Sequence, residues 1–506
     1  SQALDSLFWW RLQEPIQVRS PHIQLWTREV IVIATAHPLS PPWRKEPLDP
    51  NALHAGVWPH SAARNSDGEL VFGGVSVSSL VQEYGTPLYV MDKDELVDRA
   101  LRVKEMVESA CKAQGTTGKV YYATKSFVSG HVVSWLSEQG LGFDVASGGE
   151  LAIALAGGAD PGTLEFQGNN KSAEELLVAM KAGIGCIVMD APIEAARIQA
   201  IAEELGITQP VMVRVNTGVH ADTHDYLATA REDQKFGLSP AESIELVEHV
   251  RTLPNLKFVG LHSHIGSQIF AAEGFLESAT RMMATYAALL QTGEVEVLNL
   301  GGGFGIAYTE SDDPQDLATL VGRIVDHVGH EAKTRAVPMP ALAFEPGRII
   351  SGPPGVTLYT VGVTKPVSVS VPEGGSATRL YVSVDGGMSD NARPALYGAH
   401  YSTRIASRES SAAPALVRVV GKHCESGDIV VDADFLPGDV APGDVIAVAA
   451  TGAYCYSLSS NYNAMGRPPV VAVSDSSHEL MVAGESIADV MARDQGFGSK
   501  SEGAHA

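Results

Sequence analysis

The chain has 506 residues, 45% hydrophobic and 19% charged, so it can bury a large core and is longer than one ordinary domain. Its formal net charge of -23 argues against nucleic acid or an anionic membrane surface as the main partner, because like charges repel. It has four cysteines but no C-x-x-C motif, which argues against a structural zinc cage or a disulfide framework and fits a reducing compartment.

Two segments precede the regular pattern of the chain. Residues 1–50 are rich in Trp, Pro and His without helical or strand periodicity, which predicts a weakly ordered extension. The apolar run 30–36 is far shorter than the roughly 20 residues of a membrane-spanning helix. No signal-peptide pattern surrounds it, so we expect a cytoplasmic protein. Residues 51–91 carry short strand-like runs, and we expect them to join a β domain formed by the end of the chain.

Short apolar runs alternate with amphipathic stretches over residues 92–355. The strand-like runs are 120–125, 142–147, 164–168, 186–190, 211–216, 258–264, 297–303 and 341–348. The stretches with the length and period of crossover helices include 172–182, 192–205, 240–251 and 274–290. Around eight such units in about 250 residues predict a (β/α)8 barrel of the TIM type.

The pattern changes after the barrel. Short alternating runs are separated by Pro-Gly and Gly-Asp turns, and they cover residues 356–371, 379–384, 415–420, 428–431 and 445–449. This pattern predicts an all-β domain over 356–491, which we expect to be a Greek-key-like barrel. The small and polar residues 492–506 predict a disordered tail.

Most of the reactive side chains fall at or near the carboxyl ends of the predicted barrel strands. They are Lys125, Asp190, His264, Gly301 to Gly303, Glu345 and Arg348. Barrel enzymes build their active sites at this face, so the positions indicate catalysis better than a structural role, which would scatter polar residues over both faces.

Lys125 follows an apolar strand in the segment KVYYATKSF. Burial at the barrel mouth can lower the pKa of its amine and make it a Schiff-base nucleophile. Taken alone, the position is more often that of a surface lysine just past a strand, since perturbed groups only tend to be functional.

The glycine-rich segment 300–305, LGGGFG, ends another predicted strand. Its backbone amides could bind a phosphate. Ile306 stands where the dinucleotide fingerprint requires glycine, so a dinucleotide is excluded. A single phosphate group and a simple tight turn both remain open.

Residues 344–348 place Glu345 and Arg348 at one strand end. A carboxylate there can keep a pyridine nitrogen protonated, and a guanidinium can bind an anion. The alternative is an ion pair across a turn. His262 and His264 share one face of their strand, but no acidic residue is near in sequence, so we expect no metal site and favour an imidazole stacked on a planar cofactor.

Seven motifs, in this order, resemble those of the fold-type III pyridoxal-phosphate decarboxylases, and within that family the diaminopimelate decarboxylases. They are YYATKSF, FDVASGGE, HSHIGSQ, LNLGGGFGIAY, EPGR, CESGD and GAYCYSLSSNYN. The resemblance covers residues 51–491, and the combination is far more specific than any single motif. It implies a pyridoxal 5'-phosphate cofactor and the decarboxylation of meso-2,6-diaminopimelate to L-lysine, the last step of lysine biosynthesis.

The resemblance also implies roles for individual residues. Lys125 would bond covalently to the cofactor, His264 would stack on its ring, and Glu345 would meet the pyridine nitrogen. The other cofactor-binding residues would be Asp144, Ser267, Gly301, Gly302, Gly303, Gly347, Arg348 and Tyr454. The catalytic residues would be Lys125, His264 and Cys424, and Cys424 would donate a proton in the barrel of the partner subunit of a homodimer.

The residues around Cys424 indicate, independently of the resemblance, whether its thiol is reactive or part of the core. A free thiol is usually a small buried hydrophobe. Residues 423–428 are polar and turn-like, which suits an exposed reactive thiol better than a core residue. We expect Cys455, which lies between two tyrosines, to be structural.

The far end of the substrate distinguishes members of this family. Ornithine ends in a bare ammonium, whereas diaminopimelate carries a second amino-acid head that needs a cation for its carboxylate and an anion for its amine. The matching residues are Arg393, Tyr397 and Glu425, although Arg393 in isolation is more often a surface charge. The expected substrate-binding residues are Arg348, Arg393, Tyr397, Glu425 and Tyr454.

Other functions stay open at this stage. They are an ornithine or arginine decarboxylase of the same fold, an amino-acid racemase with paired bases, and a non-catalytic pyridoxal-phosphate carrier. A racemase of this fold type is shorter and lacks the CESGD and GAYCYSLSSNYN pairing, and a carrier would lack a β domain. The product distinguishes them, since only a decarboxylase releases carbon dioxide.

Overall fold

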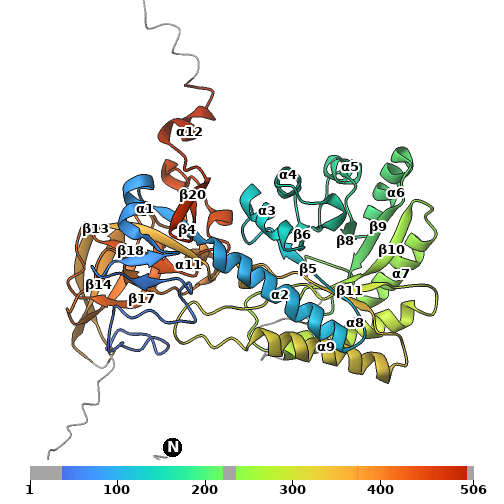
Figure 1. The fold of residues 1–506 in the computed structure, drawn as a ribbon, viewed down its shortest axis with the longest axis horizontal. Helices are drawn as coiled ribbons and strands as arrows, with labels where there is room; N and C mark the ends of the chain where they lie inside the picture. The colour runs from blue at the N-terminus through green and yellow to red at the C-terminus, as the bar shows by residue number, and fades with distance from the viewer. Residues whose placement is uncertain (1–36, 220–234, 373, 498–506) are drawn as a thin grey trace, which may run out of the picture. The chain divides into compact units, whose positions relative to one another are not determined.

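The structure, a computed structural model, describes residues 37–219, 235–372 and 374–497. The described residues belong to one compact unit, and residues 1–36 lie outside the described part. Within this unit, a barrel and a sheet domain are distinct (Figure 1).

Eight parallel strands close into a barrel in the order β10-β11-β12-β5-β6-β7-β8-β9. The strands are β5 (Gly118–Ala123), β6 (Gly142–Val145), β7 (Leu164–Phe166), β8 (Cys186–Met189), β9 (Gln209–Arg214), β10 (Leu256–His262), β11 (Val297–Asn299) and β12 (Ala341–Phe344). The predicted TIM-type barrel is therefore confirmed. Several strands end before the predicted runs end, because the polar and glycine residues that close those runs lie in loops at the barrel mouth.

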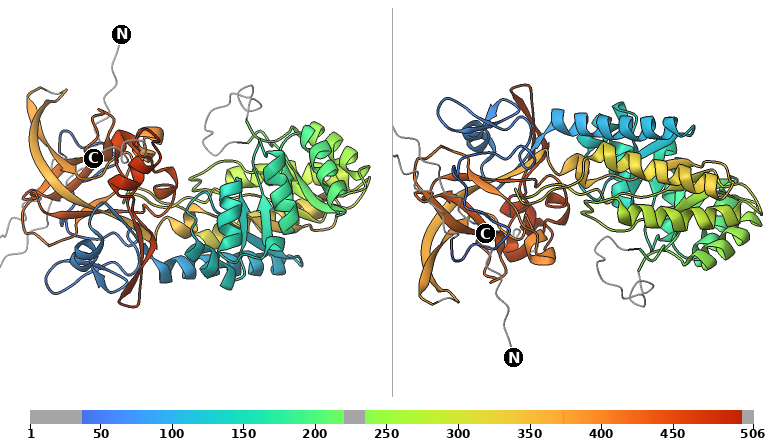
Figure 2. Two further views of the ribbon diagram at one scale, coloured as in Figure 1. Left: turned by 90° about the horizontal axis from the view of Figure 1, so that it is seen from above. Right: turned by 90° about the horizontal axis from the view of Figure 1, so that it is seen from below.

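Helices surround the barrel, as two further views show (Figure 2). They are α2 (Lys93–Ala113), α3 (Gly130–Glu138), α4 (Gly148–Ala156), α5 (Ala173–Ala182), α6 (Ile193–Leu205), α7 (Pro240–Arg251), α8 (Glu273–Leu289) and α9 (Leu317–Thr334). Local signals determine several of their starts. Ser172 and Ser239 form capping boxes with glutamates three residues later, and Pro240 occupies the first turn of α7, where no N–H is needed.

The second domain is mainly β, as expected. Its sheet has nine strands with the path β17-β16-β14-β13-β4-β19-β20, and β15 and β18 branch from it at β13. The bounds are β4 (Leu88–Asp92), β13 (Gly355–Ser370), β14 (Ser376–Val384), β15 (Thr403–Ile405), β16 (Pro414–Val420), β17 (Ile429–Pro437), β18 (Val445–Ala449), β19 (Val470–Ser474) and β20 (Ser477–Val482). Strand β4, which precedes the barrel in sequence, pairs with both β13 and β19.

Residues before β4 pack on this sheet. They form a small sheet of β1 (Ala63–Arg64), β2 (Leu70–Phe72) and β3 (Val75–Ser76), followed by α1 (Val77–Tyr84). Phe72 and Leu80 share an apolar core with Leu358 of β13. Segments far apart in sequence therefore build one core.

Residues 37–50 differ from the weakly ordered extension that we expected there. The Trp43 ring stacks on His400 with 4.1 Å between ring centroids. The Arg44 guanidinium is buried, forms an ion pair with Asp434 and donates to Ser402 Oγ at 3.3 Å. A paired buried cation and a stacked aromatic ring hold this segment, and composition alone does not reveal either contact. Of the expected tail 492–506, residues 498–506 lie outside the described part, and the described end is exposed after α12 (Ile487–Ala492).

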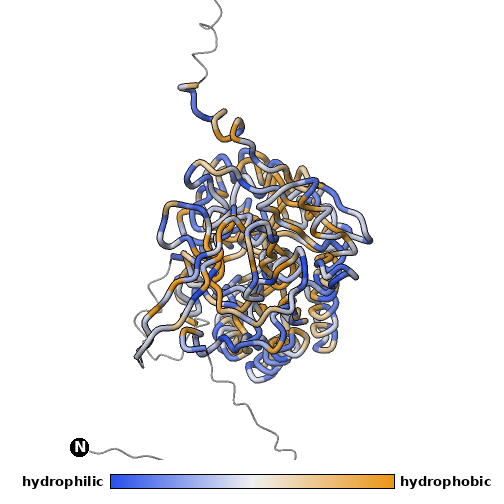
Figure 3. Tube along the Cα trace, turned by 90° about the vertical axis from the view of Figure 1, so that its left-hand side faces the viewer, coloured by the Kyte–Doolittle hydropathy of each residue, from blue (hydrophilic) through white to orange (hydrophobic). Residues whose placement is uncertain are grey.

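Hydrophobic residues concentrate in the interior, while hydrophilic segments lie mostly at the periphery (Figure 3). The largest core cluster combines inward faces of the barrel helices with barrel strands and β-domain residues such as Tyr359 and Val448. Among the described residues, no helix has the length and apolar character needed to cross a membrane.

Candidate active site

Lys125 lies two residues beyond the end of β5, with its side chain exposed at the barrel mouth. Desolvation lowers the pKa of its amine, but Asp144, Tyr454 and Glu345 raise it, and the net shift is upward. The net direction is therefore opposite to the lowering that we expected from burial. Asp144 lies on β6 and Glu345 follows β12, the two strands that pair with β5, and Tyr454 belongs to the β domain, so none of them could be read from the segment around Lys125.

Glu345 follows β12 directly and is 6% exposed. Its Oε1 accepts from Gln167 Nε2 at 2.5 Å and from Asn299 Nδ2 at 2.8 Å. Its Oε2 lies 3.0 Å from His262 Nε2. Burial would raise the pKa of Glu345, but His262 and Lys125 lower it to about 2, so this carboxylate is anionic at neutral pH.

The two histidines of HSHIGSQ have different environments. His262 is buried against Glu345, which is the acidic partner that its neighbours in sequence do not supply. His264 is partly buried, and the backbone N of Gly302 donates to its Nδ1 at 3.3 Å. Burial, Lys125 and Arg214 hold the pKa of His264 well below its ordinary value, so its imidazole is neutral. The described residues contain no cluster of three or more His, Cys, Asp or Glu side chains that could bind a metal ion.

The glycine segment after β11 packs closely against the neighbouring loops. A Cβ atom on Gly302 would lie 2.0 Å from the carbonyl oxygen of Glu345, and one on Gly301 would lie 2.5 Å from that of Ser263. Gly301 also has a φ of +69°, which side chains disfavour. Close packing therefore requires glycine here, and this requirement is compatible with a phosphate site.

Arg348 and Glu345 do not pair across the turn. Arg348 is buried, its Nη2 donates to Ser267 Oγ at 2.8 Å, and its Nη1 donates to the hydroxyl of Tyr308. Its guanidinium carbon lies 4.6 Å from the ring centroid of Tyr454. The structure thus brings three expected residues, Ser267, Arg348 and Tyr454, into one cationic and polar cluster. Gly347 lies just before Arg348, and a Cβ there would approach Ser126 Oγ to 3.0 Å.

Arg393 lies in the short helix α11 (Arg393–Tyr397) and is 6% exposed, so it is not a surface charge. Its Nη1 donates to the hydroxyl of Tyr401 at 2.5 Å, and its guanidinium carbon lies 4.7 Å from the ring centroid of Tyr308. Tyr308 therefore contacts both Arg348 and Arg393, and it links the barrel to the β domain. Tyr397 is 69% exposed at the other end of α11.

Cys424 and Glu425 are both exposed on the turn before β17. Beneath them, buried His423 lies 3.0 Å from Asp428 through Nδ1, and the backbone N of Cys424 donates to Asn463 Oδ1 at 3.2 Å. Within the described ranges, no hydrogen bond or ion pair joins Cys424 or Glu425 to the barrel of the same chain. The structure of one chain therefore does not bring these two residues to Lys125. Cys455, by contrast, is buried, and its Sγ lies 3.6 Å from the hydroxyl of Tyr401.

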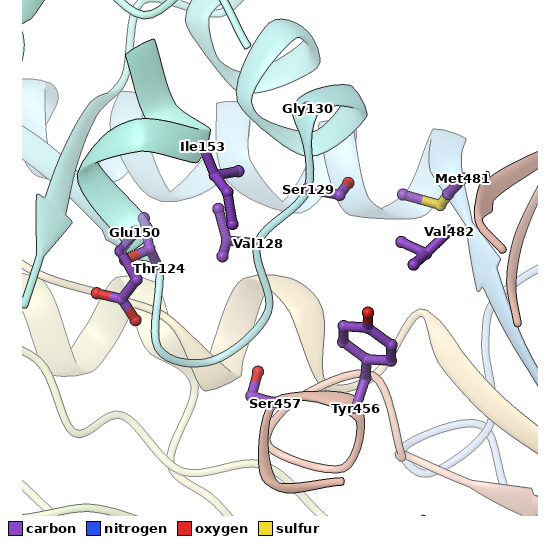
Figure 4. Close-up of a pocket in the computed structure, with 10 residues that line it drawn as sticks. All are labelled: Thr124, Val128, Ser129, Gly130, Glu150, Ile153, Tyr456, Ser457, Met481 and Val482. Atoms are coloured by element: carbon purple, nitrogen blue, oxygen red, sulfur yellow. The ribbon is translucent and has the colours of Figure 1, made fainter. Parts of the chain in front are cut away.

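A cavity of about 400 Å³ lies beside the loop that carries Lys125 (Figure 4). Barrel residues and β-domain residues line it together, and they are Thr124, Val128, Ser129, Gly130, Glu150, Ile153, Tyr456, Ser457, Met481 and Val482. Ser457 Oγ also donates to the carbonyl oxygen of Ser126 at 3.1 Å. The β domain thus supports the loop after β5 from outside the barrel mouth.

The residues at the mouth fit pyridoxal phosphate. Several buried polar atoms have no hydrogen-bond partner among the described residues, and Asp144 Oδ1, His262 Nδ1 and Arg348 Nε are among them. An anionic carboxylate suits a protonated ring nitrogen, and a buried guanidinium beside a serine and a glycine loop suits a phosphate. Unpaired buried groups of this kind cost free energy unless a ligand satisfies them.

Sequence reasoning missed several residues of this site. Gln167 and Asn299 hydrogen-bond Glu345, and Tyr308 joins the two arginines. Asn299 and Tyr308 lie within the motif LNLGGGFGIAY, so their position offered a signal. Gln167 lies in none of the seven motifs, and its role depends on strand order in the closed barrel.

The chain is similar to known proteins over most of its length. Residues 100–352 match the protein family described as "Pyridoxal-dependent decarboxylase, pyridoxal binding domain". The chain is 46% identical over 447 residues to diaminopimelate decarboxylase of Mycobacterium bovis, covering 87% of this chain and 98% of the relative. It is 41% identical over 443 residues to the enzyme of the same name from Bacillus subtilis, covering 87% and 98% respectively.

Solved structures are similar as well. The chain superposes on diaminopimelate decarboxylase from M. jannaschii in complex with L-lysine with a TM-score of 0.78 and 31% identity, covering 86% of this chain and 97% of the other. The corresponding enzyme from Helicobacter pylori with L-lysine gives a TM-score of 0.72 and 28% identity, covering 82% and 98%. A lysine/ornithine decarboxylase from Vibrio vulnificus, at 20% identity and a TM-score of 0.63, shares the fold.

Proposed function

The chain belongs to the diaminopimelate decarboxylases, a family of pyridoxal-dependent decarboxylases, and from this premise we propose how its own residues divide the reaction. It decarboxylates meso-2,6-diaminopimelate to L-lysine in lysine biosynthesis, and its cofactor is pyridoxal 5'-phosphate. The observation that carries the proposal is that the Lys125 amine and the anionic Glu345 carboxylate lie at the same barrel mouth, near enough for each to shift the pKa of the other.

The cofactor residues act at opposite ends of the site. When bound, the cofactor supplies an electron sink for the pair left by the departing carboxylate. Lys125 would hold the cofactor covalently through its amine, and Glu345 would keep a proton on the ring nitrogen, which its pKa of about 2 supports. His264, whose imidazole is neutral, would lie against the ring. The other binding groups are Asp144, Ser267, Gly301 to Gly303, Gly347, Arg348 and Tyr454.

The substrate residues lie toward the β domain. Arg393 binds the distal carboxylate, because its buried guanidinium is close to the cluster around Arg348 through Tyr308. Glu425 binds the distal amine and Tyr397 contacts the same head, while Arg348 and Tyr454 contact the end that reacts. A buried cation at this place favours diaminopimelate over ornithine, because ornithine has no distal carboxylate to bind it.

Cys424 would donate a proton to the carbon that loses its carboxylate, and Lys125 would hold the cofactor between turnovers. Cys424, Glu425 and Tyr397 are exposed in the single chain. We infer that they complete the barrel site of a partner subunit in a homodimer, so that two sites are shared across an isologous interface. The proposed domains are residues 92–355 for the cofactor-binding barrel and residues 51–91 with 356–491 for the β domain that carries the donor.

The cytoplasm is the proposed location. An exposed catalytic thiol must stay reduced to carry a proton, and all four cysteines of the chain are free thiols. A reducing compartment maintains both conditions.

A side-by-side assay tests the proposed substrate. Purified holoenzyme is given meso-diaminopimelate, ornithine or arginine at equal concentrations, and carbon dioxide and the amine product are followed. We expect carbon dioxide and L-lysine from diaminopimelate alone. Faster release from ornithine would contradict the assignment of Arg393, and enantiomer exchange without carbon dioxide would identify a racemase.

A further inference from the structure

Asn299 ends strand β11 and is completely buried. Its Nδ2 donates to Glu345 Oε1 at 2.8 Å and to Glu165 Oε2 at 2.7 Å. Its Oδ1 accepts from the backbone N of Gly301 at 2.9 Å. A primary amide has two N–H donors and one carbonyl oxygen, so this side chain uses both donors and its acceptor at once.

These bonds join two parts of the site with different tasks. In the proposed function, Glu345 meets the ring nitrogen of the cofactor and Gly301 begins the phosphate loop. We propose that Asn299 is a positioning residue that couples the ring-nitrogen carboxylate to the phosphate loop, so that one buried amide sets the spacing between them. This inference rests on the proposed placement of the cofactor.

Backbone packing supports the same coupling. The backbone N of Glu345 donates to the carbonyl oxygen of Gly301 at 2.8 Å. The two loops are so close that a Cβ on Gly302 would lie 2.0 Å from the Glu345 carbonyl oxygen. The two loops are therefore close enough for one side chain to link them, and Asn299 supplies that link in addition to the backbone contact.

The chemistry of Asn299 suits its second carboxyl partner. Glu165 on β7 is fully buried, and burial together with the charge of Glu345 raises the pKa of Glu165 well above its ordinary value. This shift favours the neutral form of Glu165, whereas the lowered pKa of Glu345 favours its anion. An acidic side chain at position 299 would place a third carboxyl group between them, whereas an amide donates to both without adding charge.

Gln167 offers a matched control. Its Nε2 donates to Glu345 Oε1, the same oxygen that Asn299 contacts, at 2.5 Å. Its Oε1 is buried and has no hydrogen-bond partner among the described residues. Gln167 therefore supports Glu345 without reaching the phosphate loop, so the two residues separate support of the carboxylate from coupling to the loop.

The test measures binding rather than turnover. Holoenzymes of the wild type, Gln167→Leu and Asn299→Ala are stripped of cofactor and titrated with pyridoxal 5'-phosphate and with pyridoxal, which lacks the phosphate, by absorbance. Gln167→Leu should weaken the binding of both compounds by the same factor, which is about tenfold for the loss of a hydrogen bond to a charged group. Asn299→Ala should also reduce the advantage that the phosphate gives to binding, again by about tenfold, since it removes the side-chain hydrogen bond to the loop.

Two different outcomes would refute the coupling by Asn299 and the proposed placement of Glu345, respectively. The first concerns the ratio of the affinities for pyridoxal 5'-phosphate and for pyridoxal. If this ratio is the same in Asn299→Ala as in Gln167→Leu, the coupling is refuted. If Gln167→Leu binds pyridoxal as well as the wild type does, the placement of Glu345 at the ring nitrogen is refuted, and the coupling with it. Should Asn299→Ala fail to fold, Asn299→Ser must show the same fall in the ratio, because its shorter side chain cannot span three partners.

Discussion

Mixing two inactive variants, Lys125→Ala and Cys424→Ala, should restore activity. Cys424 is exposed on the β domain, whereas Lys125 lies at the barrel mouth. If each β domain serves the partner's barrel, a mixed dimer has one site with both changes and one site with neither. Equal amounts that associate at random give half mixed dimers, each with one intact site of two, so the mixture should recover about a quarter of wild-type activity.

The assay unfolds the two variants together, refolds them and follows carbon dioxide release from meso-diaminopimelate. Native mass spectrometry measures the fraction of mixed dimers, and each variant refolded alone provides the baseline. Mixed dimers without activity would show that Cys424 serves its own subunit or has no catalytic role. Full activity of Cys424→Ala by itself would show that another group donates the proton.

Borohydride reduction followed by peptide mass spectrometry should find the cofactor on Lys125, and its recovery on another lysine would contradict the proposed site. Arg393→Ala and Glu425→Ala should lower kcat/KM for diaminopimelate by up to roughly 10⁴-fold, because the distal amino-acid group of the substrate loses its partner. The cofactor absorbance should stay normal. Unchanged kcat/KM in both variants would mean that the distal group binds elsewhere. Because the pKa of Glu345 falls from 4.5 to about 2 on folding, its stabilising contribution is present above about pH 4.5 and is lost as pH falls toward 2. The free energy of unfolding of Glu345→Gln, measured with denaturant at each pH, should not show this loss. If it falls with pH in parallel with that of the wild type, the lowered pKa of Glu345 is contradicted.

Local sequence determined the barrel. Each strand and its following helix are specified by residues close together in the chain, through apolar runs, 3.6-residue periodicity and caps such as Ser172 and Ser239. Parallel strands place their carboxyl ends at one face of the barrel. The sequence alone therefore assigns Lys125, His264 and Glu345 to the same barrel mouth. The motif order similarly identified the family, because each motif is a short continuous segment.

Contacts between segments distant in sequence could not be predicted in this way. The sequence could not show that Glu345 lies against His262, 83 residues away, or that Gln167 donates to the same carboxylate. It also led to the wrong direction for the pKa of Lys125, because desolvation can be guessed from an apolar strand while the opposing charge of Asp144 cannot.

The sequence by itself therefore determined the fold, the family and the identity of most candidate residues, since periodicity and motifs are local properties. Only the tertiary structure decided that Arg393 is buried against Tyr308, that residues 37–50 pack through Arg44, and that Asn299 bridges Glu345 to Gly301. The physical reason is that charge, burial and hydrogen bonding depend on which atoms closure of the barrel and pairing of the sheet bring within a few ångströms, whatever their separation along the chain.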